Sequence, residues 1–459
     1  MAQTYDAIVI GAGQAGPSLA ARLAGEGMQV AMVERHLFGG TCVNVGCIPT
    51  KTLVASARSA YDARRAAEYG VVIDGSISVD MKAVKARMDA MRGASNKGVE
   101  GWLKSMENCT VYETHARFEG PRLLRVGEDL IEADKIFINV GGRASAPPVP
   151  GLESVDYLTN SSMMEVDFLP EHLIVLGGSS IGIEFGQMYR RFGSEVTIIQ
   201  RGGRIISRED EDVSDAVREI LEAEGVTVIT DTGDLAAEKR GDGVAIRMTC
   251  GGAPREVAGS HLLVATGRRP NTDDLGLEAA GVETDARGYV TVDDSLQTSV
   301  PGVWAMGDCN GRGAFTHTSY NDYEIVAANL LGGDSRRVSD RILTYGLFID
   351  PPLGRVRMTE AQARESGRKV LAAKKPMSHI SRAKEKGETQ GFMKFLVVAD
   401  TKEFLGAAVL GVGGDEIVHA TTDIMYAKAP YTVIQRAVHI HPTVSELIPT
   451  TLAELAPLE

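Results

Sequence analysis

The chain has 459 residues, of which 44% are hydrophobic and 24% charged, and its net charge is −13. This length suits about three domains of roughly 100–200 residues each. The acidic balance argues against a nucleic-acid or anionic-membrane partner, because both need clustered lysine and arginine. The N-terminus shows no signal-peptide pattern, and no uncharged apolar run approaches the roughly 20 residues of a membrane span, so we expect a cytoplasmic protein.

The N-terminal segment predicts a dinucleotide-binding βαβ unit. The apolar stretch DAIVIGAGQAG reads as a strand that opens into Gly11, Gly13 and Gly16, and a second strand, QVAMVE, ends in Glu34. The glycines allow a tight turn, a close backbone approach to a pyrophosphate and close helix–strand packing. Glu34 can accept hydrogen bonds from ribose hydroxyls and repels a 2′-phosphate, so this unit suits an FAD-like dinucleotide.

The next motif, GGTCVNVGCIPTK, holds two of the five cysteines, Cys42 and Cys47. In a regular helix their Cα atoms would lie about 8.6 Å apart, whereas a disulfide needs less than about 7 Å. The first helical turn must therefore be distorted, which Gly39, Gly40 and Gly46 permit. A strained disulfide at a helix start should be easily reduced, and the helix N-terminus should favour a thiolate. A structural zinc site is the alternative, but it needs four ligands, and no second Cys/His cluster lies nearby.

A second unit of the same design begins at HLIVLGGSSIGIEFG, with Gly177, Ser179 and Gly182 in the glycine frame. Its second strand, EVTIIQR, ends in Gln200. Gly11 to Glu34 and Gly177 to Gln200 are both separated by 23 positions, which strengthens the interpretation as a repeat. Ser179 replaces the middle glycine, so the backbone approach is more crowded here.

The end of this second strand predicts the nucleotide. Gln200 is neutral and is followed by Arg201, Arg204 and Arg208. Guanidinium groups suit a phosphate monoester, so this unit is expected to prefer NADPH, with NADH left open. The alternative is that these arginines only form a solvated loop.

Together, the two units, the C-x4-C pair, the GDC segment with Asp308 and the terminal HPTVSE segment resemble the class I pyridine nucleotide–disulfide oxidoreductases. That family includes glutathione reductase, dihydrolipoyl dehydrogenase and mercuric reductase, and the resemblance spans essentially the whole chain. It implies an α/β fold with two Rossmann-like dinucleotide-binding domains and a C-terminal α+β dimerisation domain. The expected boundaries are 1–150 and 271–341 for the FAD-binding domain, 151–270 for the NAD(P)H-binding domain and 342–459 for the dimerisation domain.

The resemblance also implies two sets of cofactor-binding residues. Those expected to hold FAD are Gly11, Gly13, Gly16, Glu34, Thr41 and Asp308. Those expected to hold NADPH are Gly177, Ser179, Gly182, Gln200, Arg201 and Gly267. No resident metal site is expected.

The resemblance assigns catalytic roles to both cysteines. Cys47 would be the flavin-proximal thiolate and Cys42 the thiol that attacks the substrate. Lys51 and Glu184 would form an ion pair beside the flavin N5.

The C-terminal segment would complete this site from a second subunit. His441, paired with Glu446, would be the acid–base residue that reaches the partner's site, so a homodimer is implied. A histidine with a pKa near 6.5 can carry the proton that a leaving thiolate needs, and a carboxylate can orient its ring.

Several residues differ from those typical of particular members of the family, and these differences narrow the choice of subgroup. Ala21 stands where glutathione reductases place a substrate arginine, and Gln200-Arg201 does not fit the usual NAD-selecting acid of dihydrolipoyl dehydrogenases. Mercuric reductases carry a C-terminal cysteine pair, whereas this chain ends in TLAELAPLE and keeps His441. The chain is most similar to mercuric-reductase-like flavoproteins, including the bacterial type linked to reactive-chlorine stress and copper reduction, with Arg355 a candidate for facing the nicotinamide or substrate.

The leading hypothesis is an NADPH-dependent FAD enzyme that reduces a small disulfide or a soft metal ion, Cu or Hg. The alternatives are a dihydrolipoyl dehydrogenase or glutathione-reductase-like enzyme and, from another class, a redox-sensing flavoprotein without turnover. The remaining cysteines and two histidines carry no committed role: Cys109 and Cys250 look like isolated thiols, Cys309 is a candidate for lying near the flavin, and His317 and His439 are expected to be structural.

Overall fold

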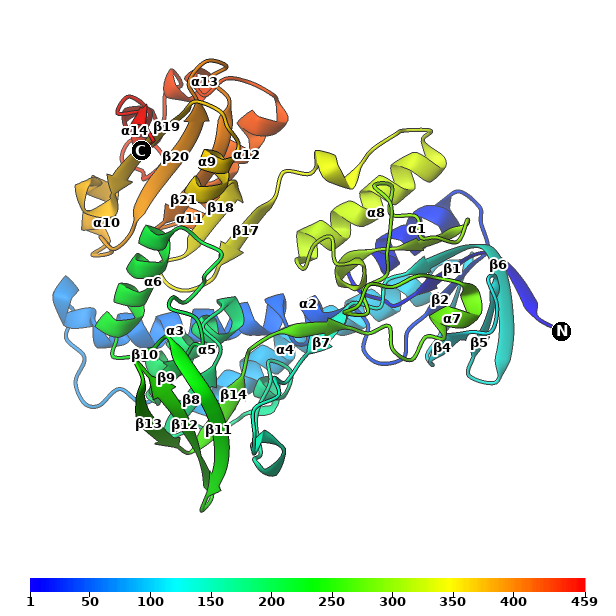
Figure 1. Ribbon diagram of the computed structural model, residues 1–459, viewed down its shortest axis with the longest axis horizontal. Coiled ribbons are helices and arrows are strands. Elements are labelled where there is room, and N and C mark those ends of the chain that lie inside the picture. Colours follow the sequence, from blue (N-terminus) through cyan, green and yellow to red (C-terminus); the bar gives the residue numbers. More distant parts are fainter. Residues whose placement is uncertain (459) are drawn as a thin grey trace.

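The first glycine-rich unit lies in a seven-stranded sheet of the computed structural model, which describes residues 1–458 (Figure 1). The strand order is β3-β2-β1-β6-β5-β4, with β16 paired to β6. The strands are β1 (Gln3–Ile10), β2 (Val30–Val33), β3 (Cys109–Tyr112), β4 (Ala116–Phe118), β5 (Leu123–Val126), β6 (Asp129–Ile138) and β16 (Val303–Ala305). β16 returns to β6 in parallel register, with Val303 opposite Ile136, so a segment near residue 300 completes the N-terminal sheet.

The second unit forms a separate four-stranded parallel sheet of order β10-β9-β8-β14. Its strands are β8 (His172–Leu176), β9 (Glu195–Ile199), β10 (Thr227–Ile229) and β14 (His261–Val264). An antiparallel sheet follows β10 in the chain and consists of β11 (Thr232–Arg240), β12 (Gly243–Cys250) and β13 (Ala253–Gly259). A separate two-stranded pair, β7 (Gly142–Ala144) with β15 (Arg268–Pro270), lies where the chain passes between the two domains.

The C-terminal part is an antiparallel sheet of order β17-β18-β21-β20-β19-β22. Its strands are β17 (Thr344–Leu347), β18 (Leu353–Arg357), β19 (Val370–Pro376), β20 (Phe392–Val398), β21 (Phe404–Leu410) and β22 (Ala456–Pro457). Its helices are α9 (Glu360–Glu365), α10 (Ser381–Glu385), α11 (Gly414–Ile417), α12 (His419–Tyr426), α13 (Thr432–Gln435) and α14 (Leu447–Leu452).

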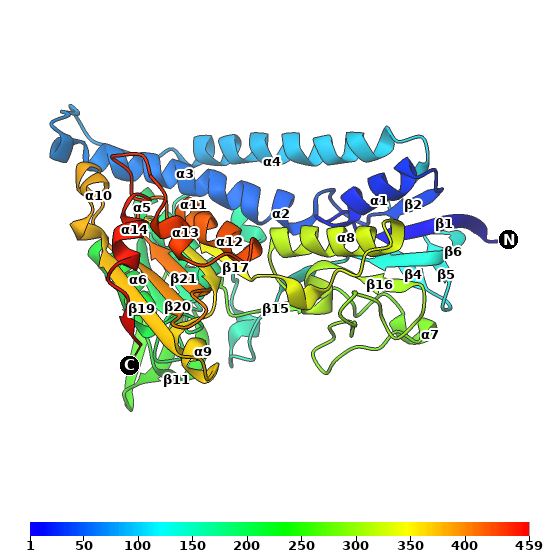
Figure 2. The ribbon, with the colours of Figure 1, turned by 90° about the horizontal axis from the view of Figure 1, so that it is seen from above.

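Two long helices run along one side of the molecule, as Figure 2 shows for α3 (Cys47–Arg64) and α4 (Met81–Lys104). Asp80 caps α4 by accepting the backbone N–H groups of Lys82 and Ala83, which are otherwise unpaired at a helix start. The other helices of the two dinucleotide domains are α1 (Gly16–Gly25), α2 (Gly40–Asn44), α5 (Ser180–Phe192), α6 (Glu211–Ala223), α7 (Leu277–Ala280) and α8 (Thr316–Leu331).

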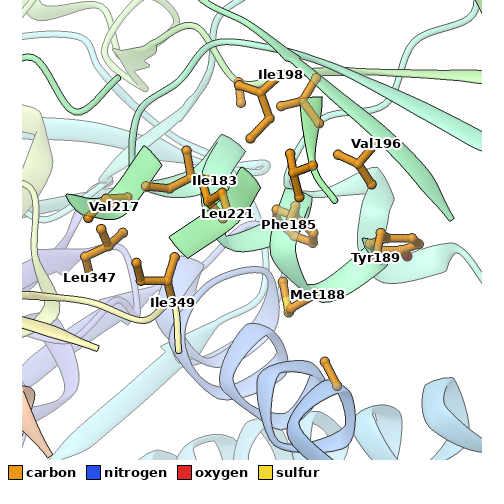
Figure 3. Close-up of a cluster of buried hydrophobic side chains, with 14 of the residues drawn as sticks. Ile183, Phe185, Met188, Tyr189, Val196, Ile198, Val217, Leu221, Leu347 and Ile349 are labelled. Carbon is orange, nitrogen blue, oxygen red and sulfur yellow. The ribbon is translucent and has the colours of Figure 1, made fainter. Parts of the chain in front are cut away.

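One apolar core connects all three parts of the chain (Figure 3). Ile183 and Phe185 on α5 pack with β9 and α6, and Leu347 at the end of β17 joins them from the C-terminal domain. Leu53 on α3 belongs to the same cluster. Since buried apolar area stabilises the fold, this core fixes α3, α5 and β17 around the region where their polar side chains meet.

The predicted fold class is therefore confirmed: two Rossmann-like units and a C-terminal α+β domain. The stretch GFMKFLVVADTKEFLGAAVLG forms two neighbouring strands of the C-terminal sheet, β20 and β21. Within residues 1–458, no helix is both long and apolar enough to cross a membrane.

Candidate functional site

The two cysteines lie on either side of a break between α2 and α3. α2 ends at Asn44 and α3 begins at Cys47, with Gly46 at φ −134° and ψ −117° between them. The helix is thus interrupted where the spacing of the cysteines required it. Both cysteines are free thiols, as in the reduced form of a redox pair.

The surroundings of the two thiols shift their pKa values in opposite directions, so that one is a thiolate and the other a hydrogen-bond donor. The pKa of Cys47 is lowered to about 6, first by the hydrogen bond from Cys42, with further help from the Thr316 hydroxyl and the positive charge of Lys51. The pKa of Cys42 is raised by that same hydrogen bond and by burial. Thr316 Oγ1 lies 3.0 Å from Cys47 Sγ. At neutral pH the negative charge therefore resides on Cys47.

A partly buried ion pair lies beside the thiols, with Glu184 buried and Lys51 half-buried. Lys51 Nζ is 2.8 Å from Glu184 Oε2, and the ammonium group lies 4.3 Å from the centre of the Phe348 ring. The other oxygen of Glu184 accepts the backbone N–H of Phe348 at 2.9 Å. This pair joins α3, α5 and the segment after β17, the three elements that the shared core brings together.

The two glycine-rich turns have the same close contacts. A Cβ on Gly11 would lie 2.4 Å from the Asn139 carbonyl oxygen, and one on Gly177 would lie 2.5 Å from that of Ala265; both residues have positive φ. A Cβ on Gly16 would lie 2.1 Å from the oxygen of Gly11, and Gly182 has the same relation to Gly177 at 2.0 Å. Only glycine fits these positions, so both turns keep the cradle of a dinucleotide-binding unit.

The residues at the ends of β2 and β9 make the same kind of hydrogen bond in the two units. Glu34 accepts the N–H of Ala12 at 2.8 Å, and Gln200 accepts the N–H of Gly178 at 2.9 Å. Ser179, in place of the middle glycine, adopts an ordinary extended conformation with φ −99°. Arg201 is exposed beside Gln200.

Arg204 and Gly267, which the sequence also places near the nicotinamide nucleotide, bind other groups of the protein. Arg204 forms an ion pair with Glu211 at 3.0 Å. The carbonyl oxygen of Gly267 accepts the N–H of Ser145 from the β7 segment.

One cavity of about 1050 Å³ runs from the first glycine turn to the thiols. It gathers nine of the predicted residues: Gly11, Gly13, Glu34, Thr41, Cys42, Cys47, Lys51, Glu184 and Asp308. Burial raises the pKa of Asp308, although Arg268 at 3.3 Å opposes this. The cavity thus places a dinucleotide cradle and a dithiol in one continuous space.

His441 and Glu446 form the expected pair but lie away from this cavity. The Nδ1 atom of His441 is 2.9 Å from a Glu446 carboxylate oxygen, so the carboxylate orients the ring. The His441 side chain is 75% exposed, and the apolar side chains of Val438 and Ile440 nearby are exposed too. Within one chain, the structure does not bring His441 to the cysteines.

Arg355 does not face the coenzyme region, contrary to the expectation. It is fully buried and makes ion pairs with Glu209 and Asp210, which precede α6. Arg355 therefore ties β18 to the second dinucleotide domain, because a buried guanidinium requires charged partners.

Cys309 is also absent from the lining of the main cavity. It is buried, and its thiol contacts the carbonyl oxygens of Ile138 and Met306. Burial raises its pKa to about 12.

Sequence reasoning missed several residues of the site. Thr316 contacts the Cys47 thiol, and Phe348 contacts the Lys51 ammonium of the ion pair. Asn139 lies against Gly11 and Gly13 in the first glycine turn. His317, expected to be structural, lines the main cavity. Each of these residues reaches the site from a distant part of the chain, so the spacing within the cysteine and glycine motifs did not assign it to the site.

A carboxylate cluster elsewhere resembles a cation site but already contains a cation. Asp210, Asp212 and Glu360 lie together, and Lys394 Nζ is 2.7–3.0 Å from all three. The lysine ammonium neutralises the carboxylates, so this cluster joins domains rather than holding an ion.

Comparison with known proteins identifies the family. The pyridine nucleotide-disulphide oxidoreductase model matches residues 5–322, and the dimerisation-domain model of the same family matches residues 344–452. The probable pyridine nucleotide-disulfide oxidoreductase RclA of Escherichia coli is 36% identical over 96% of this chain and 97% of its own, and a mercuric reductase of Streptomyces lividans is 34% identical over 97% and 94%.

A solved structure supports the same assignment. The Cu(II) complex of the HOCl-induced flavoprotein disulfide reductase RclA from E. coli superposes with a TM-score of 0.89 at 34% identity, covering 99% of this chain and all of that one. The chain therefore belongs to the pyridine nucleotide-disulphide oxidoreductase family.

Proposed function

We propose that the protein takes electrons from NADPH through FAD to the Cys42–Cys47 pair, and passes them to a small disulfide or a soft metal ion. The observation that carries this proposal is the single cavity that joins the first glycine cradle to a dithiol with a stabilised thiolate. Cytoplasmic location remains a prediction from the sequence.

The described residues fit FAD in the first unit. The glycine turn at Gly11 leaves a space beside the backbone that any Cβ would fill, Glu34 would accept hydrogen bonds from ribose hydroxyls, and Asp308 lines the same cavity. When bound there, FAD supplies two-electron transfer between a nicotinamide and the cysteine pair. Lys51, held by Glu184, would place a positive charge beside the flavin.

NADPH fits the second unit. The glycines Gly177 and Gly182 keep the pyrophosphate cradle. The neutral Gln200 removes the repulsion that an acidic residue would exert on a 2′-phosphate, and the exposed Arg201 offers a donor to it. This support favours NADPH over NADH.

The raised pKa of Cys42 means that this thiol must give up its proton to a base before it attacks. Its thiolate then attacks a substrate disulfide, forms a mixed disulfide and expels one thiolate, which takes up a proton as it leaves. The Cys47 thiolate then attacks the Cys42 sulfur, which closes the Cys42–Cys47 disulfide and releases the second thiol. A low pKa keeps Cys47 ready for this step at neutral pH.

A second subunit would supply the proton carrier. His441 is oriented by Glu446, yet it is exposed and lies away from the thiols of its own chain. In a homodimer formed through residues 344–452, the partner copy would place His441 at the site, where it would protonate each leaving thiolate.

A soft metal ion is the second acceptor class. Thiolates are the ligands that soft ions prefer, and the site holds two thiols in an accessible cavity. The similar proteins are named as mercuric reductases and as a Cu(II) complex of RclA, which favours this class.

The test is NADPH consumption by the purified holoenzyme with glutathione disulfide, oxidised lipoamide, Cu(II) and Hg(II) as separate acceptors. We expect turnover with NADPH above that with NADH, and loss of turnover in Cys42→Ser. Turnover on lipoamide alone would identify a dihydrolipoyl dehydrogenase. No turnover on any acceptor, in a protein that binds FAD, would favour the redox-sensing alternative and contradict the proposal.

A further inference from the structure

The first turn of α8 is attached to strand β17 of the C-terminal domain. Thr316, the first residue of α8, lies with its hydroxyl 3.0 Å from the Cys47 sulfur. The next residue, His317, has its Nε2 atom 2.7 Å from the carbonyl oxygen of Thr344, and because a carbonyl can only accept, Nε2 donates. The position of the Thr316 hydroxyl therefore depends on the start of β17.

Phe315, the residue before Thr316, adds a second attachment through its ring. The Phe315 ring lies parallel to the Tyr345 ring of β17, with 5.5 Å between the ring centres and 4° between their planes. The His317 ring is also nearly parallel to it, at 5.4 Å and 9°. Such stacked aromatic pairs contribute more than the area they bury, so the Tyr345 ring fixes the side chain beside Thr316.

The orientation of Tyr345 is itself fixed by the second dinucleotide domain. The Tyr345 hydroxyl donates to one carboxylate oxygen of the buried Glu209, which precedes α6. Arg355, opposite Tyr345 in the register of β17 and β18, donates its Nε–H to the other oxygen at 2.8 Å. Burial and the negative charge of Glu209 raise the pKa of Tyr345, so its hydroxyl keeps the proton that it donates.

We propose that Tyr345 is a positioning residue for the thiol chemistry. Held by Glu209, its ring fixes the side chain of Phe315. Phe315 in turn keeps the hydroxyl of the neighbouring Thr316 against the Cys47 sulfur. The inference deepens the proposed function and rests on its thiol chemistry, in which the Cys47 thiolate closes the disulfide.

The experiment compares Tyr345→Phe with the wild type in the reduced, FAD-loaded enzyme. Phenylalanine keeps the ring but cannot donate to Glu209, so the ring loses the bond that fixes its orientation against Phe315. Alkylation of Cys47 by iodoacetamide is followed by mass spectrometry near pH 6, where this thiol titrates. We expect the rate to fall about twofold or more, since residues within one contact network are commonly coupled by at least this much.

The matched control is Tyr69→Phe. It removes a hydroxyl that donates to the carbonyl oxygen of Lys386, outside the lining of the main cavity. This variant should alkylate at the wild-type rate. A wild-type rate in Tyr345→Phe as well would overturn the positioning role and leave Tyr345 as a link between domains, which a lower thermal stability alone would report.

A double-mutant cycle tests whether Tyr345 acts through Thr316. In a Thr316→Val background the hydroxyl is absent, so Tyr345→Phe should cause no further change in the alkylation of Cys47. An equal loss in the presence and absence of the Thr316 hydroxyl would overturn the proposed route.

Turnover tests the proposed function separately, because alkylation needs no electron acceptor. Slower alkylation of Tyr345→Phe in an enzyme that reduces none of the acceptors would overturn the proposed function and support the positioning role. NADPH-dependent turnover together with unchanged alkylation of Tyr345→Phe would overturn only the positioning role.

Discussion

At the scale of single residues, the acidity of Cys47 comes from its neighbours. The largest contribution is the hydrogen bond from Cys42, which favours the thiolate form of Cys47. We predict that Cys42→Ala raises the pKa of Cys47 from about 6 toward its ordinary value, because alanine cannot donate. The pH dependence of Cys47 alkylation by iodoacetamide measures this, and an unchanged midpoint would contradict the assignment.

Thr316 makes the second contact with that thiolate. Its hydroxyl lies 3.0 Å from Cys47 Sγ, and hydrogen bonds to charged groups contribute about 1.5–3 kcal/mol. Thr316→Val should therefore raise the Cys47 pKa by about one unit or more. Thr316→Ser keeps the hydroxyl and is the matched control, which should alkylate with the wild-type pH profile.

At the scale of elements, the break between α2 and α3 sets the geometry of the cysteines. A Cβ on Gly46 would lie 2.8 Å from the carbonyl oxygen of Thr41, so Gly46→Ala must displace the turn that carries Cys42. We expect the dithiol of this variant to close to a disulfide more slowly, as measured by thiol loss during oxidation with oxidised dithiothreitol.

The control for this prediction is Gly101→Ala in α4. Nothing lies within 4 Å of a Cβ at Gly101, so alanine there should leave disulfide closure unchanged. It should also stabilise the helix by about 0.5–1 kcal/mol, because glycine in a helix costs conformational entropy. Closure at the wild-type rate in Gly46→Ala would show that the break tolerates a side chain.

At the scale of the whole molecule, charged side chains connect the three domains. Arg58 on α3 and Arg191 on α5 both bind Asp350, which follows β17. Arg191 is almost fully buried, and Tyr61 stacks on its guanidinium at 3.8 Å. This network lies beside the shared core and holds the domains in the arrangement that forms the cavity.

We predict that Asp350→Asn lowers the free energy of unfolding by about 2 kcal/mol near pH 7, because it removes one of the two carboxylates that pair with the buried guanidinium of Arg191 and leaves only Glu224. Although burial opposes it, the attraction of Arg191 and Arg58 lowers the pKa of Asp350 in the folded state. The stabilisation is therefore present above the unfolded pKa of about 3.9 and is lost as the pH falls through the lower folded value. Thermal unfolding from pH 7 to pH 3 measures this, and the difference between the variant and wild type should shrink at the acid end.

The exposed ion pair between Asp62 and Arg58 is the control for the Asp350 prediction. Asp62, which pairs with Arg58 on the surface of α3, is mostly accessible to solvent. Asp62→Asn should cost at most about 1 kcal/mol, since exposed ion pairs contribute little. Equal losses in the two variants would mean that burial of the Asp350 network adds no stability.

The sequence alone determined the local chemistry. Glycines at Gly11 and Gly177 can be identified because a tight turn leaves no space for a Cβ, and the five-residue spacing of Cys42 and Cys47 required a helix break that the structure contains. The pairing of His441 with Glu446 could also be predicted, because both residues lie in one short segment. In each case the residue types and their spacing within one short segment carry the signal, although the carbonyl groups that exclude a Cβ at Gly11 and Gly177 belong to the distant residues Asn139 and Ala265.

Only the tertiary structure decided which distant residues share the cavity. Thr316 meets Cys47 across 269 positions, and His317 and His419, from different domains, both line the main cavity. The same packing turns Arg355 inward to Glu209 instead of toward the coenzyme. Such contacts depend on how a shared core positions α3, α5 and β17, and this long-range packing leaves no periodic trace in any local stretch of sequence.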